Sequence, residues 1–598
     1  MIKVNRCLYF SVEKGEREMP VVNLDIEDLA RLVGDDFDLE SFKEEIPMIG
    51  ATVEKVEEGE ISMEFFPDRP DLFSIEGVAR AYRKFSGKGK EDLSKTHRIE
   101  GSSGIELEVD PSVAGIRPVI GAAFIKGVKI DDKALISIMN LQEKLHITVG
   151  RKRRKVAIGI HDASLLKPPF RYWGADPGEI SFVPLQKEEE WDLERILKEH
   201  EKGTAYAWIL EGMGKYPIIT DSRDQVLSFP PIINGELTRV TEDTKDIFID
   251  CTGWDRKAVE LSVNIVCSQL MDRGGTLEDV LVTYPEGDEF KKLGLETGSW
   301  PHFDWQPMSA DRNWTKKWLG KDLNPDEIER SLLRTGYERI SVKEDEFGCL
   351  IPPWRGDILH QADLVEDVAV GLGFDSFGGM VSKRSTMGSE RRLSTISRYV
   401  RQTLIGMGFL EVRTISLSNE QSQFSLMGRD EHEHLKLTNP ITVDHTMMRM
   451  SCLPSLMALL KANKHRDLPQ RLFETGDVMV GNRNRNLLSG VSEDNKASFT
   501  EVKGYVQRKL QDLAVPYVLE PVELGRYIKG RSAALMVELP DDIKMGTGPF
   551  PELEKGKMVP LGHFGEVDPS IITESELTTP VSAFEIDLDL LKEMANIL

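Results

Sequence analysis

The chain has 598 residues, of which 40% are hydrophobic and 29% are charged, and its formal net charge is −24 at pH 7. This length exceeds what a single hydrophobic core supports, so three to five domains are expected. No segment approaches the roughly eighteen apolar residues of a membrane-spanning helix, and no membrane association is expected. The negative charge argues against a protein that binds nucleic acid nonspecifically over its whole surface, because such proteins are usually basic.

The cysteines point to a reducing compartment. They are dispersed, odd in number and never spaced as CxxC, which argues against a disulfide framework or a zinc ribbon and favours the cytoplasm. The five positions are Cys7, Cys251, Cys267, Cys349 and Cys452.

The first part of the chain predicts a small α/β domain over residues 19–90. A patterned start at Met19 leaves residues 1–18 as a possible extension. Asp25 is the expected N-cap of a first helix, and Gly87 the expected C-cap of a second one, SIEGVARAYRKFSG. A polar linker is expected at residues 88–104.

Residues 105–295 alternate apolar strands with helices and predict a mixed α/β domain. Its most basic stretch is GRKRRK, residues 150–155, for which a solvated turn and a phosphate-contacting loop are both open. An irregular linker is expected over residues 283–307.

Two further domains are expected, at 305–377 and 390–598. The smaller one contains a helix with Asn324 as N-cap, Pro325 at its first position and Glu327 at its third. The larger one mixes helices and strands after a hinge rich in Gly, Ser and Lys. The whole chain is therefore predicted to be a multidomain α+β protein.

An acidic segment, PPWRGDILHQADLVEDVAVGLGF, lies in the smaller domain. Val365, Val368, Ala369 and Leu372 recur with helical spacing, which predicts an apolar stripe with the carboxylates on the opposite face. These carboxylates form either a solvated face or a site for a hard cation, and Arg355 could offset part of their charge. They belong to Asp357, Asp363, Glu366 and Asp367.

Motif searches exclude several enzyme classes. The chain contains no GxxxxGK[ST], no strand-anchored GxGxxG, no HExxH and no GxSxG. Four segments, in order, resemble instead the beta subunit of phenylalanyl-tRNA synthetase of the archaeal and eukaryotic-cytosolic type. The first segment is MPVVNLDIEDLARLVG with FFPDRPDLFSIEGVARAYRKFSG, and the second is QEKLHITVGRKRRKVAIGIHD with PPIINGELTRVTEDTKDIFIDCTG. The third is PPWRGDILHQADLVEDVAVGLGFD, and the fourth is LTNPITVDHTMMRMSCLPSLMALLKANKHRDLPQRLFETGDV.

The resemblance assigns a role to each domain. It implies an editing domain at 105–295, a small winged-helix-like, metal-linked domain at 305–377, and a class II synthetase-like antiparallel core flanked by helices at 390–598. It also implies that the four carboxylates bind a magnesium ion shared with the alpha subunit. A few carboxylates with retained waters suit magnesium.

The last domain departs from a working synthetase site. Arg471 and Glu474 are one residue too far apart for the Arg-x-Glu motif, and GRSAALMVEL at 530–539 lacks the glycine pattern of the second arginine motif. The domain is therefore expected to be a catalytically silent copy that packs against the active alpha subunit. Arg449 is expected to be a buried structural charge.

The resemblance places a hydrolytic site in the editing domain. Asn234, Asp250 and Thr252 are polar residues among apolar neighbours and are the candidates, although each also suits an ordinary role in a turn or strand. They are expected to position substrate and water rather than to attack.

The predicted protein is a non-catalytic but obligatory subunit of an ATP-dependent ligase that joins phenylalanine to its tRNA in a two-alpha, two-beta assembly. It is expected to supply a tRNA-contacting scaffold and to edit tyrosyl-tRNA. A free-standing editing hydrolase and an RNA-binding scaffold paralogue are the alternatives.

Overall fold

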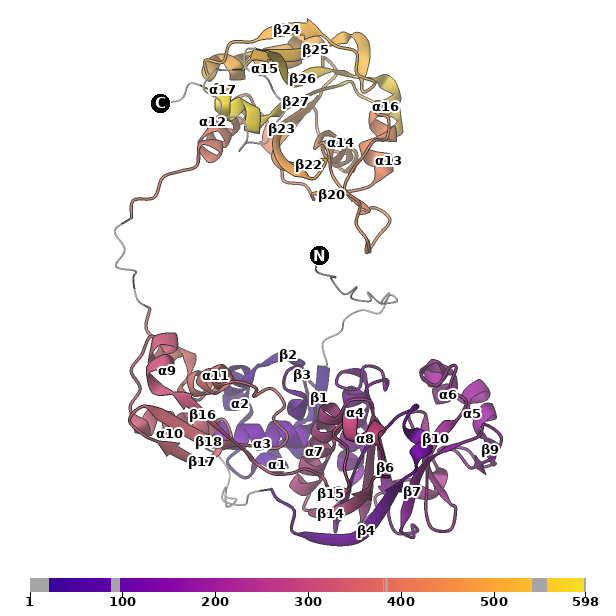
Figure 1. Ribbon diagram of the computed structural model, residues 1–598. Coiled ribbons are helices and arrows are strands. Elements are labelled where there is room, and N and C mark those ends of the chain that lie inside the picture. Colours follow the sequence, from indigo (N-terminus) through magenta and orange to yellow (C-terminus); the bar gives the residue numbers. More distant parts are fainter. Residues whose placement is uncertain (1–20, 88–96, 380, 382–385, 540–556, 596–598) are drawn as a thin grey trace. The chain divides into compact units, whose positions relative to one another are not determined.

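The computed structural model describes residues 21–87, 97–379, 381, 386–539 and 557–595. The chain forms two compact units, Met1–Val381 (unit 1) and Ser382–Leu598 (unit 2), each with mixed α and β structure (Figure 1). The predicted extension at 1–18 lies outside the described residues. Within the described ranges, no helix has the length and apolar character needed to cross a membrane.

Unit 1 begins with a three-stranded sheet in the order β1-β3-β2. Local signals define its helices as predicted. Asp25 accepts a hydrogen bond from the Asp28 amide at 2.8 Å, and Gly87 ends a helix in the left-handed region at φ 68°. The elements are β1 (Val21–Asp25), α1 (Ile26–Val33), α2 (Leu39–Glu45), β2 (Ala51–Glu57), β3 (Glu60–Phe65) and α3 (Ile75–Ser86).

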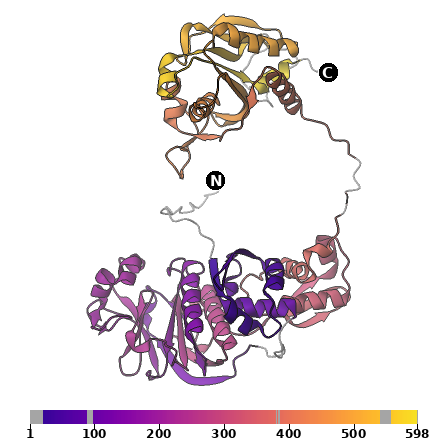
Figure 2. The ribbon, with the colours of Figure 1, turned by 180° about the vertical axis from the view of Figure 1, so that it is seen from behind.

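A ten-stranded sheet follows, in the order β12-β11-β10-β7-β4-β14-β5-β13-β6, with β15 also paired to β14. Helices α4 (Asp132–Ile147) and α7 (Arg256–Asp272) pack together and cover its β5, β13 and β6 strands (Figures 1 and 2). The strands are β4 (Gly101–Val109), β5 (Val119–Lys126), β6 (Val156–Asp162), β7 (Phe170–Ala175), β10 (Tyr216–Thr220), β11 (Val226–Phe229), β12 (Ile233–Asn234), β13 (Ile247–Gly253), β14 (Thr276–Thr283) and β15 (Gly298–Trp300).

Two predicted linkers are partly ordered structure. Strand β4 begins at Gly101, inside the expected linker 88–104, of which residues 88–96 lie outside the described residues. The expected linker 283–307 contains β15 and the short helix α8 (Asp288–Lys292). Both predictions were wrong because β4 and β15 are held by backbone pairing with β14, which local composition does not reveal.

The third sheet of unit 1 has the order β16-β18-β17 and packs beneath α10 and α11. The predicted capping box is confirmed, because Asn324 and Glu327 each accept a hydrogen bond from the other's amide at 2.9 Å. The elements are β16 (Gln306–Asp311), α9 (Arg312–Leu319), α10 (Pro325–Arg334), β17 (Glu338–Val342), β18 (Glu346–Ile351) and α11 (Gln361–Leu372).

Helix α7 ties these three parts of unit 1 together. Arg273, just after the helix, pairs with the carboxylates of Asp28 and Glu76, each at 2.6 Å. Within α7, the side-chain amide of Asn264 donates to the carbonyl of His302 at 3.0 Å and to that of Pro353 at 3.1 Å. All of these contacts are buried or partly buried, so unit 1 is one cooperative packing arrangement.

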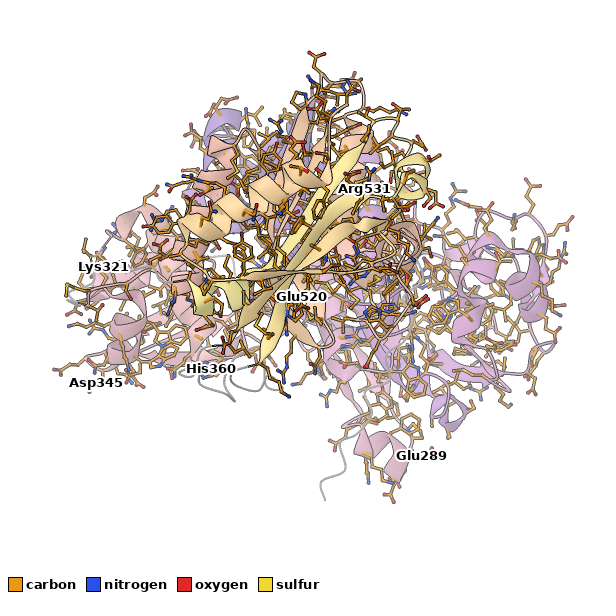
Figure 3. The ribbon with its side chains drawn as sticks, turned by 90° about the horizontal axis from the view of Figure 1, so that it is seen from above. Glu289, Lys321, Asp345, His360, Glu520 and Arg531 are labelled. Carbon is orange, nitrogen blue, oxygen red and sulfur yellow. The ribbon has the colours of Figure 1, made fainter. Side chains whose placement is uncertain are left out.

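Unit 2 is built on a seven-stranded sheet in the order β19-β22-β23-β27-β26-β25-β24, antiparallel except for the β19–β22 pair. One apolar cluster lies under α12, α15 and α17 and another under α14 and α16. Figure 3 marks its β24 and β25 strands at Glu520 and Arg531. The main elements are α12 (Arg392–Gly406), β19 (Leu410–Glu411), β20 (Leu417–Ser418), β21 (Met447–Met448), α14 (Leu453–Ala462), β22 (Gln470–Val480), β23 (Arg483–Glu493), α15 (Phe499–Asp512), β24 (Val518–Pro521), β25 (Tyr527–Glu538), β26 (Met558–Val567), α16 (Pro569–Glu574), β27 (Val581–Asp587) and α17 (Leu588–Met594).

Candidate functional site

The ten-stranded sheet and helix α4 enclose a cavity of about 390 Å³. This volume is in the range of small-molecule sites. Its walls combine apolar side chains with a few polar groups, the composition typical of a pocket for an aromatic or aliphatic ligand. The apolar walls include Leu135, Ile138, Pro230, Ile232 and Val240, and the polar groups include Gln142, Ser228, Asn234, Thr238 and Asp250.

A buried chain of polar groups lies at one wall of this cavity. The imidazole of His161 donates through Nε2 to Oδ2 of Asp250 at 2.7 Å, because an ionised carboxylate can only accept. Its Nδ1 lies 2.8 Å from the hydroxyl of Thr238. His161 and Asp250 are almost fully buried. The pair fixes the carboxylate and leaves its second oxygen without a described partner.

Gly159 makes room for this pair. It lies directly opposite Asp250 in the β6–β13 register. A Cβ atom at this position would approach Oδ2 of Asp250 to 2.0 Å and Nε2 of His161 to 2.6 Å. Only glycine therefore permits the two side chains to meet over β6.

The three predicted editing residues have different surroundings. Asp250 and Asn234 both line the cavity, and the Asn234 amide donates to the Ile160 carbonyl at 3.4 Å. Thr252 is fully buried and does not line the cavity; its hydroxyl accepts from Nε of Arg117 at 2.9 Å. Three further residues of this site, His161, Thr238 and Ser228, were not predicted from the sequence. The one available signal was a histidine inside the apolar strand sequence VAIGIHD.

The acidic segment is organised around Arg355. This buried guanidinium donates to both oxygens of Asp357, at 2.8 and 2.6 Å, and to Asp367 at 2.8 Å. The hydroxyl of Tyr337 also donates to Asp367, at 2.6 Å. Arg355 therefore offsets the charge of Asp357 and Asp367, as expected from the sequence.

Helix α11 buries more of its surface than predicted. Val365, Val368 and Ala369 are buried as expected, but Asp367 is also buried at 8% exposure, so its expected place on the opposite face was wrong. The buried face is broad because α11 packs on both α10 and β16.

The other two carboxylates of α11 differ in their partners. Asp363 accepts from the amides of Leu359 and His360, each at 2.7 Å, at the helix start marked by His360 in Figure 3. Glu366 is exposed and has no cationic partner among the described residues. Partial burial and the charges of Asp367 and Asp363 raise the pKa of Glu366.

Magnesium is usually bound by one or two carboxylates together with waters, and the four carboxylates of the acidic segment are its candidate ligands. In the described residues, no three His, Cys, Asp or Glu side chains stand together in metal-binding geometry. The chemistry of the set nevertheless fits a hard cation at its outer edge, where Glu366 and Asp363 face negative neighbours and Arg355 neutralises only Asp357 and Asp367. All four carboxylates line one cavity with Asp68 of the FFPDRPDLF segment.

In unit 2, two arginines make structural contacts. Arg449 is buried and pairs with Glu474 at 2.8 Å. Arg471 donates to Glu501 at 3.3 Å. Since alternate residues of a strand face opposite sides, Arg471 and Glu474, three apart on β22, cannot share one face. The stretch GRSAALMVEL lies largely in strand β25 instead of opening a helix.

Unit 2 also exposes apolar side chains in one loop. Residues 438–444 are all exposed, and this segment extends from the sheet near β20 (Figure 1). Ile441 and Val443 in it are 88% and 85% exposed.

Three regions of the chain match known protein families. Residues 129–281 match the B3/4 domain, residues 308–374 match the tRNA synthetase B5 domain, and residues 380–588 match the phenylalanyl tRNA synthetase beta chain CLM domain. The cavity, the acidic helix and unit 2 therefore fall in separate matched regions.

Whole-chain relatives agree with these matches. The phenylalanine–tRNA ligase beta subunit of Archaeoglobus fulgidus is 40% identical over 573 residues, covering 95% of this chain and 98% of the relative. That of Methanocaldococcus jannaschii is 37% identical over 583 residues, covering 96% and 100%. An N-terminal fragment of the phenylalanyl-tRNA synthetase beta subunit from Pyrococcus horikoshii is 34% identical with a TM-score of 0.55, covering 59% of this chain and 99% of the fragment. The chain belongs to the phenylalanine–tRNA ligase beta-subunit family.

Proposed function

We propose that this chain is the beta subunit of a cytoplasmic phenylalanine–tRNA ligase. The complex uses ATP to join phenylalanine to tRNA(Phe), releasing AMP and diphosphate, and it contains two alpha and two beta subunits. Family membership carries this proposal. The free, buried cysteines at 251, 267, 349 and 452 suit a reducing compartment.

The cavity of the ten-stranded sheet is the editing site for tyrosyl-tRNA. Apolar walls accommodate the aromatic ring, and the carboxylate of Asp250, held by His161, accepts a hydrogen bond from the tyrosine hydroxyl. Phenylalanine would leave this buried acceptor without a partner. A site built for a substrate hydroxyl rejects the analogue lacking it by about 10⁴–10⁵-fold. Asn234 and Ser228 position the rest of the substrate, and Thr252 supports the wall through Arg117.

The experiment that tests editing is hydrolysis of tyrosyl-tRNA by the purified complex. Asp250→Asn should lower kcat/KM for this hydrolysis by roughly a hundredfold, because a buried hydrogen-bonded charge is replaced. The charging of tRNA with phenylalanine should be unchanged. Equal hydrolysis by the wild type and the variant would refute the assignment of the site.

The acidic cavity of the winged-helix-like B5 domain holds a magnesium ion shared with the alpha subunit. Glu366 and Asp363 are its expected ligands, with Asp357 and Asp367 contributing directly or through water. When bound, the ion supplies positive charge to a segment whose carboxylates outnumber Arg355. Asp363 also fixes the helix start and Arg355 orders Asp357 and Asp367, so the protein pre-arranges the segment.

Unit 2 is a catalytically silent, class II synthetase-like core that packs against the alpha subunit. The ion pair of Arg471 with Glu501 occupies the side chain that an Arg-x-Glu motif would present to ATP, and the apolar loop around Ile441 and Val443 offers the contact surface. Amino-acid activation accordingly takes place in the alpha subunit.

A further inference from the structure

The basic loop at residues 150–155 has an unusual backbone. It joins α4 to β6, and five of its six residues are basic. Arg151, Lys152 and Arg153 are three consecutive non-glycine residues in the left-handed region, at φ 48°, 55° and 66°. Each such residue costs about 1–2 kcal/mol relative to a right-handed conformation. Strain of this kind is retained where the surrounding structure enforces it and is concentrated at functional sites.

The turn is fixed by contacts of Arg153 and of the backbone. The Arg153 amide donates to the His146 carbonyl at 3.0 Å. Its guanidinium donates to the Ile232 carbonyl at 2.9 Å and to Glu143 at 2.6 Å, and lies 4.5 Å above the ring of Tyr206. The turn therefore directs Arg153 inward while its two predecessors remain exposed.

Arg153 belongs to the wall of the editing cavity. It lines that cavity together with Asp250 and Asn234 and is 7% exposed. Its Nε–H group is buried and has no hydrogen-bond acceptor among the described residues. An unpaired buried donor costs about 1–3 kcal/mol, so this wall of the cavity carries an uncompensated polar group.

The exposed residues of the loop are also available to an anion. Arg151 and Lys152 are exposed and form no ion pair with any residue that the structure describes. The nearby acids are already engaged: Glu143 pairs with Arg153 and Lys202, and Asp255 pairs with Lys155. In a chain of net charge −24, such a local excess of positive charge is where a polyanion can approach.

We propose that this loop binds the phosphate groups at the single-stranded 3′ end of the substrate RNA, Arg153 from the cavity wall and Arg151 and Lys152 beside it. The proposal rests on the editing function proposed above. An amino acid esterified to the terminal ribose enters the cavity, and the adjoining phosphodiesters remain at its mouth. Phosphate contacts supply affinity and register without reading sequence. The strained turn keeps Arg153 in the cavity wall and Arg151 and Lys152 at the surface next to it.

The test compares the wild-type complex with a complex that carries the double variant Arg151→Gln with Lys152→Gln, each with the full-length chain. One substrate is tyrosyl-tRNA and the other is 3′-O-tyrosyl-adenosine, which has no phosphate. We expect the variant to raise KM for tyrosyl-tRNA about tenfold at low salt with little change in kcat. The slope of log kcat/KM against log salt should fall by about 1.4, since each single-strand phosphate contact contributes about 0.7. Hydrolysis of the phosphate-free ester should not change.

The matched control is Lys291→Gln, Lys292→Gln, another adjacent pair of exposed cations, on α8. This helix protrudes from unit 1 where Glu289 is labelled in Figure 3 and does not line the cavity. The control should keep the wild-type KM and salt slope. If the loop variant also keeps them while the wild type hydrolyses both esters, the loop proposal alone is overturned. If the wild type hydrolyses neither ester, the editing function is overturned and this proposal with it.

Discussion

At the scale of single residues, a glycine decides whether the pair of His161 and Asp250 can form. Gly159→Ala would place a Cβ atom 2.0 Å from Oδ2 of Asp250 and so displace the carboxylate from His161. We expect the hydrolysis of tyrosyl-tRNA to fall at least tenfold while phenylalanine charging is preserved, measured as initial rates on the two reactions. Gly178→Ala is the control, because Gly178 is exposed and nothing lies within 4 Å of the added atom. Normal hydrolysis by the Gly159 variant would contradict the role given to Asp250.

A buried lysine gives a second prediction at this scale. Lys509 on α15 is 1% exposed, and its ammonium has no hydrogen-bond partner among the described residues. Burial holds the pKa of Lys509 well below its usual range. Lys509→Met should therefore stabilise unit 2 by about 1–3 kcal/mol at neutral pH, because an unsatisfied polar group is removed. Hydrogen exchange of the α15 amides measures this change, with Lys503→Met on the same helix as the control.

The sign of the pH dependence follows from the lowered pKa. Between that value and the ordinary lysine pKa, the unfolded chain binds more protons than the folded one, so stability increases with pH. The wild type should gain protection in α15 between pH 7 and pH 9, beyond the common change in exchange chemistry, and the gain should be absent in Lys509→Met. Equal gains in both proteins would show that Lys509 is not the titrating group.

At the scale of elements, helix α11 separates capping from cation binding. Asp363→Ala removes the acceptor for two amides at the helix start and should destabilise unit 1 by about 0.5–2 kcal/mol in chelator, and by more in magnesium because a proposed ligand is also lost. Glu366→Gln should instead stabilise unit 1 by a few tenths of a kcal/mol in chelator, since like charges at helical spacing repel. It should also lose most of the stabilisation that magnesium gives to the wild type. Thermal unfolding in chelator and in magnesium distinguishes the two variants, and a full magnesium effect in Glu366→Gln would exclude that ligand.

The elements also show which predictions the sequence allowed. The caps at Asp25 and Asn324 were predicted because each depends on residues within three positions. Asp250 was recognised as a polar residue among apolar neighbours, but its partner His161 was not, since their contact depends on the pairing of β6 with β13. The burial of Asp367 depends likewise on packing against distant elements. Long-range register and packing are the information that a single sequence conceals.

At the scale of the whole molecule, the exposed loop of unit 2 predicts how the subunits associate. Ile441→Asp with Val443→Asp should weaken association with the alpha subunit at least tenfold, because two exposed branched residues that the proposed interface would cover become charged. Co-expression followed by sizing and a charging assay measures the effect. Met387→Asp is the control, at a side chain that is 100% exposed outside this loop. If the wild-type chain does not associate and charging does not need it, the free-standing hydrolase becomes the better account.

The ties made by helix α7 bear on how the protein can be divided for study. Arg273 belongs to the sequence of the B3/4 region, but both of its carboxylate partners belong to the first small sheet and its helices. The side-chain amide of Asn264 likewise donates to the carbonyls of His302 and Pro353, which follow β15 and β18. A truncation that isolates residues 129–281 would thus leave a buried cation and a buried amide without partners. Unit 1 as a whole keeps the cavity together with all of these contacts.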